Sequence, residues 1–264
     1  MPSRVIASDL DGTLIPPELD EARRRDIARF GRAAAGRALR LAYVTGRHAP
    51  LALAGIREAG LPPPAWLFAD VGTSLHVPDG PAYAEDPEFH RAMIDALGLA
   101  SFDEIRRRLA GLAGLELQDA AKQAEFKLSY DVRGRDPADV VPAARARVGA
   151  LAGRLTFVAS RDPITGHGLL DVLPADSGKR FALEWLRRAA GLDAPDVLFA
   201  GDSGNDRDAL LSGHPAVLVG NAPGPLREAL RREARETGVE DRVYFARASF
   251  AAGVLEGCRH FGFL

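Results

Sequence analysis

The segment at residues 5–13 constrains the fold most strongly, because a short apolar run there ends in two aspartates. Four apolar or small residues precede Asp9, one residue separates it from Asp11, and Gly12 and Thr13 follow. A short apolar run bounded by a turn signal is typical of a buried parallel strand. Because ligands bind at the carboxyl ends of strands in open α/β sheets, we expect both aspartates to stand at a functional edge.

The first part of the chain alternates expected strands and helices. We expect strands at residues 5–8, 38–44 and 66–69, and helices at 18–35 and 51–59. Strands that alternate with helices predict a parallel sheet covered by helices. The pattern changes near residue 80.

Beyond that point a smaller module is expected, followed by a return to the first pattern. The module has helices at 88–98 and 139–151 and strands at 125–132 and 155–160; the alternation then resumes with strands at 169–174, 197–200, 216–219 and 243–245 and helices at 177–190, 225–236 and 250–260. We therefore predict a doubly wound α/β fold with a mainly parallel sheet. Its catalytic core spans residues 1–82 and 171–264, and an inserted α+β cap spans 83–170.

Composition narrows the functional classes. The 264 residues suffice for one large domain or two modest ones, and the formal net charge of −2 gives no support to nucleic-acid binding. The single cysteine, Cys258, cannot form an intrachain disulfide, so we expect a cytoplasmic protein. We find neither a signal-peptide pattern nor an apolar stretch of about 18 residues, and expect no membrane span.

Polar clusters at 9–13, 45–47, 179 and 202–206 follow or flank expected core strands. Because strand ends on one edge of a parallel sheet lie side by side, Asp9, Asp11, Asp202 and Asp206 should share one crevice. Two like charges about 4 Å apart repel by roughly 4 kcal/mol at an effective dielectric constant of 20. Lys179 supplies only one positive charge, so the cluster requires a divalent cation. Ligands that are all oxygen favour Mg²⁺.

Such a cation beside Lys179, Thr45 and the backbone amide of Gly46 would form a phosphate site. Two carboxylates two positions apart allow one to attack phosphorus while the other handles the proton of the leaving oxygen. We therefore predict phosphoryl-transfer chemistry at Asp9 and Asp11. From these two residues alone, a metal-binding turn or a receiver-like phosphoacceptor also stays open.

In chain order, residues 9–13, 45–47, 179 and 201–206 resemble the four motifs of the haloacid dehalogenase superfamily of phosphohydrolases. The resemblance implies a Rossmann-like core in which Asp9 is the nucleophile that forms an aspartyl-phosphate. It also implies that Asp11 protonates the leaving alcohol and later activates water, while Lys179 screens the nucleophile and the phosphate.

The same resemblance implies ligand sets. Thr45, Gly46 and Arg47 would contact the substrate phosphate. Asp202 would bind Mg²⁺ together with Asp9 and the carbonyl of Asp11, and Asp206 and Asn205 would act around the ion.

Within the superfamily, the chain is similar to sucrose-phosphate phosphatases. The matching stretches are residues 43–47, 71–73, 127–130, 171–174 and 260–264. The similarity implies a sugar phosphate monoester as substrate, with sucrose 6-phosphate as the first candidate and mannosylfructose phosphate as an alternative. A sugar-phosphate synthase that supplies the substrate is the expected partner.

Selectivity is expected to lie in the cap. Glu125, Lys127 and Ser129 alternate on an expected strand, so they share one face and could bind sugar hydroxyls; a solvated sheet face is the competing interpretation. Two departures from the family pattern affect substrate choice: the segment 161–168, which contains His167, is long, and Arg180 stands where a glycine commonly follows the motif lysine.

One alternative function fits the same residues, and two others fit them less well. A phosphotransferase or mutase on the same scaffold would use the same site. A non-catalytic partner of a synthase would not need all of the motif residues, and a dehalogenase would not need Asp11. We expect the cap to close over the site, with hinges near 80–84 and 168–174.

Overall fold

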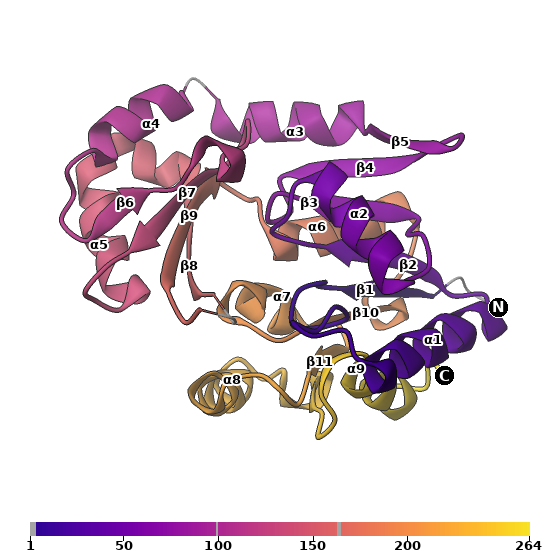
Figure 1. Ribbon diagram of the computed structural model, residues 1–264. Helices are drawn as coiled ribbons and strands as arrows, with labels where there is room; N and C mark the ends of the chain where they lie inside the picture. Colours follow the sequence, from indigo (N-terminus) through magenta and orange to yellow (C-terminus); the bar gives the residue numbers. More distant parts are fainter. Residues whose placement is uncertain (1–3, 99, 163–164) are drawn as a thin grey trace.

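The computed structural model describes residues 4–98, 100–162 and 165–264, which form two sheets and their helices. Figure 1 shows a larger unit with strands β1–β5 and β10–β12 and a smaller unit with strands β6–β9. We call them the core and the cap.

The core sheet has the strand order β12-β11-β10-β1-β2-β3-β4-β5. Neighbours from β12 to β3 pair in parallel, and β4 and β5 add an antiparallel hairpin to the β3 edge. The strands are β1 (Val5–Ser8), β2 (Arg40–Val44), β3 (Trp66–Ala69), β4 (Ser74–Asp79), β5 (Ala82–Glu85), β10 (Val197–Gly201), β11 (Ala216–Leu218) and β12 (Val243–Phe245). The predicted doubly wound, mainly parallel sheet is confirmed.

Helices cover both faces of the core sheet, because the parallel strands are apolar on both sides. Along β1, Ile6 points into one hydrophobic cluster while Val5 and Ala7 point into the other. Helices α1 (Glu21–Gly36), α2 (Ala49–Ala59) and α9 (Phe250–His260) pack on the Ile6 face; α3 (Pro87–Leu97), α6 (Lys179–Ala189), α7 (Arg207–Leu210) and α8 (Gly224–Glu236) pack on the opposite face.

The cap is a four-stranded antiparallel sheet with the order β6-β7-β9-β8. Its elements are α4 (Phe102–Leu109), β6 (Leu115–Leu117), β7 (Leu128–Val132), α5 (Pro137–Val148), β8 (Leu155–Arg161) and β9 (Gly168–Pro174). Helices α4 and α5 bury Ile105, Leu109, Val140 and Val148 against the sheet. The cap therefore has a hydrophobic cluster of its own.

The prediction that the strand at 169–174 belongs to the core is wrong. This strand is β9, which pairs antiparallel with both β7 and β8 at the centre of the cap sheet. A short apolar run fits a buried strand in either sheet, so periodicity alone does not choose between them. The chain therefore returns to the core after Pro174 rather than at residue 171, and the expected hinge at 168–174 lies inside a strand.

The first crossing into the cap also lies later than expected. Strand β5 belongs to the core sheet, and α3 packs on the core through Phe89, whose ring centroid lies 5.5 Å from that of Phe68. The expected cap boundary at residue 83 and hinge at 80–84 thus fall within the β4–β5 hairpin of the core.

Further elements differ from the expectation. Helix α4 and the short strands β4–β6 were not predicted. The expected strand at 125–132 begins only at Leu128, because Ala124 and Lys127 close a turn through mutual backbone hydrogen bonds of 3.1 and 3.2 Å. Among the described residues, no helix combines the length and the apolar character needed to cross a membrane.

Candidate active site

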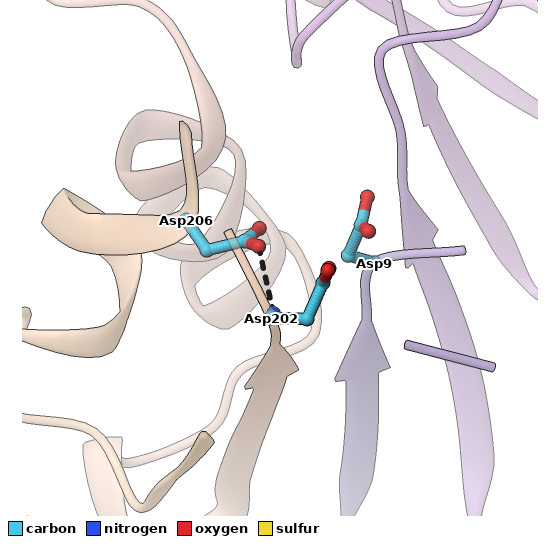
Figure 2. A group of neighbouring side chains, drawn as sticks. All are labelled: Asp9, Asp202 and Asp206. Atoms are coloured by element: carbon cyan, nitrogen blue, oxygen red, sulfur yellow. Dashed lines mark hydrogen bonds between the residues drawn. The ribbon is translucent and has the colours of Figure 1, made fainter. Parts of the chain in front are cut away.

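Three buried aspartates meet at the carboxyl edge of the core sheet. Asp9 follows β1, Asp202 follows β10, and Asp206 ends the short 3₁₀ helix at Gly204–Asp206 (Figure 2). The pairing of the two parallel strands continues past the end of β1, since the Asp9 amide donates to the Ala200 carbonyl over 2.9 Å. Each aspartate offers a carboxylate oxygen, and these three oxygens lie within 4.8 Å of one another.

Lys179 links two of these carboxylates from the first turn of α6. Its Nζ donates to Asp9 Oδ1 and to Asp206 Oδ1, both over 2.7 Å. The lysine side chain is 1% exposed, so the two ion pairs are shielded from water and from salt. The predicted meeting of residues 9, 179 and 206 is thus present in the structure.

Asp206 is held by the loop in which it lies. Its Oδ2 accepts hydrogen bonds of 3.0 Å from the amides of Asp202 and Ser203, and its Oδ1 accepts from Lys179. Asn205 Oδ1 accepts from the Ser203 hydroxyl over 2.9 Å. Because both oxygens of Asp206 already have partners, this carboxylate is suited to orient Lys179 and the 202–203 backbone.

The turn after Asp9 is fitted closely to Asp202. Gly12 has a φ of +77°, and a Cβ at this position would lie 2.3 Å from Asp202 Oδ2. The Thr13 hydroxyl donates to Asp202 Oδ1 over 3.0 Å, and the Asn221 side-chain amide donates to the Gly12 carbonyl over 2.8 Å. Glycine is therefore required here both for its backbone conformation and for the absence of a side chain.

Asp11 lies apart from the three-carboxylate group and pairs with Arg47. The Arg47 Nε donates to Asp11 Oδ2 over 2.8 Å, and a second guanidinium nitrogen donates to Oδ1. Arg47 belongs to the loop after β2, where its amide donates to the Thr45 hydroxyl over 3.1 Å. The structure thus brings the first and second polar clusters together, with the Asp11 side chain turned toward the arginine rather than toward Asp202.

Burial and mutual repulsion perturb the carboxylates. Burial is the main cause that raises the pKa of Asp9 to about 7, with Asp206 and Asp11 adding to the rise and Lys179 opposing it. Burial, together with Asp9 and Asp206, likewise raises the pKa of Asp202 to about 8. One lysine therefore does not neutralise the group, and oxygen ligands at this spacing fit a divalent cation such as Mg²⁺.

The three cap residues expected to share a face do not do so. Lys127 is buried, and its Nζ lies 3.3 Å from the Gly46 carbonyl. Ser129 is buried and donates to Asp171 Oδ1 over 2.6 Å. Glu125 precedes β7, has a side chain that is 66% exposed, and pairs with His90. The alternation fails because residues 124–127 form a turn.

The segment 161–168 is the β8–β9 turn, in which residues 163–164 lie outside the described part. Arg161 pairs with Asp136 over 2.8 Å, and His167 is exposed and lines a pocket formed by cap residues. Just before the turn, Ala159 and Ser160 pack against Gly204 of the core. Arg180 is exposed and lines a cavity between β8 and the core loop at 204–208.

Two polar residues near the site were not predicted. Asp70, which follows β3, is buried and pairs with His48, the residue after Arg47. Strand-end position was the available signal, because the cluster at 70–73 follows a core strand as the other motifs do.

Comparisons with known proteins agree with this geometry. The model of the sucrose-6F-phosphate phosphohydrolase family matches residues 2–262. A mannosylfructose-phosphate phosphatase of Agrobacterium fabrum is 30% identical over 99% of this chain and 98% of its own. A HAD-like hydrolase of Nitrosococcus oceani is 35% identical over 97% of this chain and 71% of its own.

Among solved structures, the sucrose-phosphatase of Synechocystis in complex with sucrose and phosphate superposes with a TM-score of 0.82. The identity is 22%, and the match covers 99% of both chains. At that identity the match supports the fold. Together with the family match over nearly the whole chain, it identifies this protein as a phosphoric monoester hydrolase of the sucrose-6F-phosphate phosphohydrolase family, within the haloacid dehalogenase superfamily.

Proposed function

We propose that the protein hydrolyses a disaccharide phosphate monoester, with Mg²⁺ as its cofactor, through an aspartyl-phosphate at Asp9. The observation that carries the proposal is the buried group of Asp9, Asp202, Asp206 and Lys179 at the strand ends. Sucrose 6-phosphate is the first candidate substrate, supported by the family match. Mannosylfructose phosphate is the second, supported by the Agrobacterium relative.

In the first half-reaction, a carboxylate oxygen of Asp9 attacks phosphorus while the bond from phosphorus to the sugar oxygen breaks. The Asp11 carboxyl gives its proton to that sugar oxygen. Lys179 donates to Asp9 Oδ1, whereas Oδ2 has only a long contact among the described residues, 3.5 Å from the Thr13 hydroxyl. The Asp9 carboxylate is thereby oriented, while Oδ2 stays available to attack phosphorus.

In the second half-reaction, Asp11 as a carboxylate takes a proton from water, and the water oxygen attacks phosphorus. The bond between phosphorus and Asp9 breaks, which releases inorganic phosphate and restores both aspartates. The pair with Arg47 positions the Asp11 side chain beside the loop at residues 45–47, which we call the phosphate loop.

The remaining core residues bind the phosphate and the cation. The Thr45 hydroxyl, the Gly46 amide, Arg47 and Asn205 would contact phosphate oxygens. Asp9, Asp202 and the Asp11 carbonyl would hold Mg²⁺, with Asp206 behind them. The ion would supply charge neutralisation for the phosphate and for the carboxylates.

In the cap, Lys127 and Ser129 are the proposed sugar-contacting residues, because both are buried and Lys127 reaches the phosphate loop. Glu125 and His167 are less suited, since both are exposed. A synthase that makes the sugar phosphate would supply the substrate. The proposal includes a cytoplasmic location, which is expected from the single cysteine.

A phosphate-release screen over sugar phosphates, with Mg²⁺ or with a chelator, tests the proposal. We expect release from a disaccharide phosphate in Mg²⁺, with little release in chelator and recovery when Mg²⁺ is added back. Release that is indifferent to chelation would contradict the metal assignment. Sugar isomerisation without free phosphate would instead favour the mutase alternative.

A further inference from the structure

The turn that follows β3 has an unusual backbone. Asp70, Val71 and Gly72 have successive φ values of +55°, +64° and +84°. A β-branched residue such as Val71 rarely adopts this conformation, which is strained and persists only where the surroundings enforce it. Backbone strain of this kind clusters at functional sites.

Backbone contacts join this turn to two parts of the active site. The Asp70 amide donates to the Arg47 carbonyl over 3.0 Å, and the Val71 amide donates to the Thr45 carbonyl over 2.8 Å. On the other side, a Cβ on Gly72 would lie 2.8 Å from the backbone of Gly178, the N-cap residue of α6. The turn thus packs between the phosphate loop and the helix that carries Lys179.

The Asp70 side chain extends these contacts toward the cap. Its Oδ2 accepts from Ser74 over 3.1 Å, and its Oδ1 pairs with His48 and lies 4.0 Å from Lys127 Nζ. Both basic partners bridge the two units: Lys127 of the cap lies 3.3 Å from the Gly46 carbonyl, and His48 Nε2 lies 2.7 Å from the carbonyl of the cap residue Ala121.

We propose that Asp70 is a positioning residue that holds the cap segment 118–129 over the phosphate loop through Lys127 and His48. The carboxylate is buried, so removing its charge leaves the Lys127 ammonium without its nearest anion at this contact. The part of the proposal that concerns the sugar rests on the proposed function, because it takes Lys127 as a residue that faces the substrate.

The main test is the variant Asp70→Asn, since asparagine tolerates a positive φ and keeps the shape of the turn. Amide hydrogen exchange over residues 118–129 should become faster than in the unmodified protein. The matched control is Asp79→Asn, an exposed position on β4, which should leave that exchange unchanged. Unchanged exchange in Asp70→Asn would overturn the proposal, whatever the substrate is.

Kinetics supply a second readout. In Asp70→Asn we expect KM for the disaccharide phosphate to rise about tenfold, the loss typical of one charge-assisted contact, with kcat altered less. Hydrolysis of p-nitrophenyl phosphate, which has no sugar to engage the cap, should change little. Equal losses on both substrates would indicate a merely structural role and contradict positioning.

A double variant protects the test against misfolding. Asp70→Asn combined with Lys127→Gln removes both charges, so it leaves no unpaired ammonium. If Asp70 acts through Lys127, the losses in the two single variants should not add in the double variant. Additive losses would contradict the coupling. If the unmodified protein releases no phosphate from any sugar phosphate, the proposed function fails, while hydrogen exchange still tests Asp70.

Discussion

The core edge and the cap face present polar side chains in two different ways. At the core edge, Asp9 and Asp202 follow adjacent parallel strands, so the strand register sets their separation. In the cap, Lys127 lies in a turn before β7, and its position depends on Asp70 and Gly46 of the other unit. The strand-end carboxylates are therefore fixed by one sheet, whereas the position of Lys127 depends on how the two units meet.

The two regions also differ in how sequence pattern relates to structure. Residues 9–13 stand where strand-end reasoning places them. Glu125, Lys127 and Ser129 do not share a face, because the expected strand starts three residues late. We therefore expect core substitutions to affect every substrate and cap substitutions to affect particular sugars.

The largest effect is expected for Asp9→Asn. The variant removes the proposed nucleophile but keeps its shape, so phosphate release should fall by roughly 10⁴-fold or more on sugar phosphates and on p-nitrophenyl phosphate alike. Steady-state phosphate release checks this. Asp241→Asn, at an exposed position in the same unit, is the control and should behave as the unmodified protein. Turnover retained in Asp9→Asn would exclude the aspartyl-phosphate.

The next effect is expected for Gly12→Ala. The added Cβ would lie 2.3 Å from Asp202 Oδ2 at a φ of +77°, so Asp202 must move. We expect a loss of about 1–3 kcal/mol in the free energy of unfolding and weaker activation by Mg²⁺. Gly80→Ala is the matched control, because Gly80 has a φ of +58° and a Cβ added there would meet no atom within 4 Å. This variant should therefore lose about 1 kcal/mol through backbone strain, without a steric clash. Denaturant unfolding and a Mg²⁺ titration separate the two; identical behaviour would refute close packing at Gly12.

A smaller effect, restricted to one substrate class, is expected for Lys127→Met. Loss of the ammonium should raise KM for the disaccharide phosphate by about tenfold, with little change for p-nitrophenyl phosphate. Glu125→Gln, at the exposed position two residues earlier, should leave both unchanged. A larger increase in KM for Glu125→Gln than for Lys127→Met would contradict the proposal that Lys127, rather than Glu125, contacts the sugar.

The smallest effect concerns the cap alone. Asp136 caps α5 by accepting from the Ala138 amide and also pairs with Arg161, and these contacts hold the pKa of its carboxyl below the ordinary value. Its stabilising contribution is therefore complete above pH of about 4 and is lost as the pH falls through the lowered pKa. Asp136→Ala should cost about 1 kcal/mol, chiefly the lost cap, because the ion pair is half exposed.

Thermal unfolding at pH 7 and at pH 3 checks this value. The difference in the free energy of unfolding between Asp136→Ala and the unmodified protein should shrink at the lower pH. Asp139→Ala, exposed in the first turn of the same helix, is the control and should cost only a few tenths of a kcal/mol. A difference in stability that grows as the pH falls would contradict the stabilising role of the ionised Asp136 carboxylate. Core activity on p-nitrophenyl phosphate should be unchanged in both variants.

Much of the core was predictable because local pattern and global fold agree there. Strand β3 and helix α9 have the expected bounds, and β1 and β10 differ by at most one residue. The cap was less predictable. Its strands are short, and the apolar run at 169–174 fits either sheet, so only the hydrogen-bond partners of β9 assign it.

The polar pattern of the sequence predicts which side chains gather at the edge of the core sheet, because residues that follow or flank the ends of parallel strands lie along the same edge. Asp9, Lys179, Asp202 and Asp206 meet for that reason. The folded chain alone shows that Asp11 faces Arg47. It also shows that Lys127 faces the core beside Asp70, while Glu125 faces solvent. These contacts depend on the meeting of segments distant in sequence, and a strand period carries no information about such meetings.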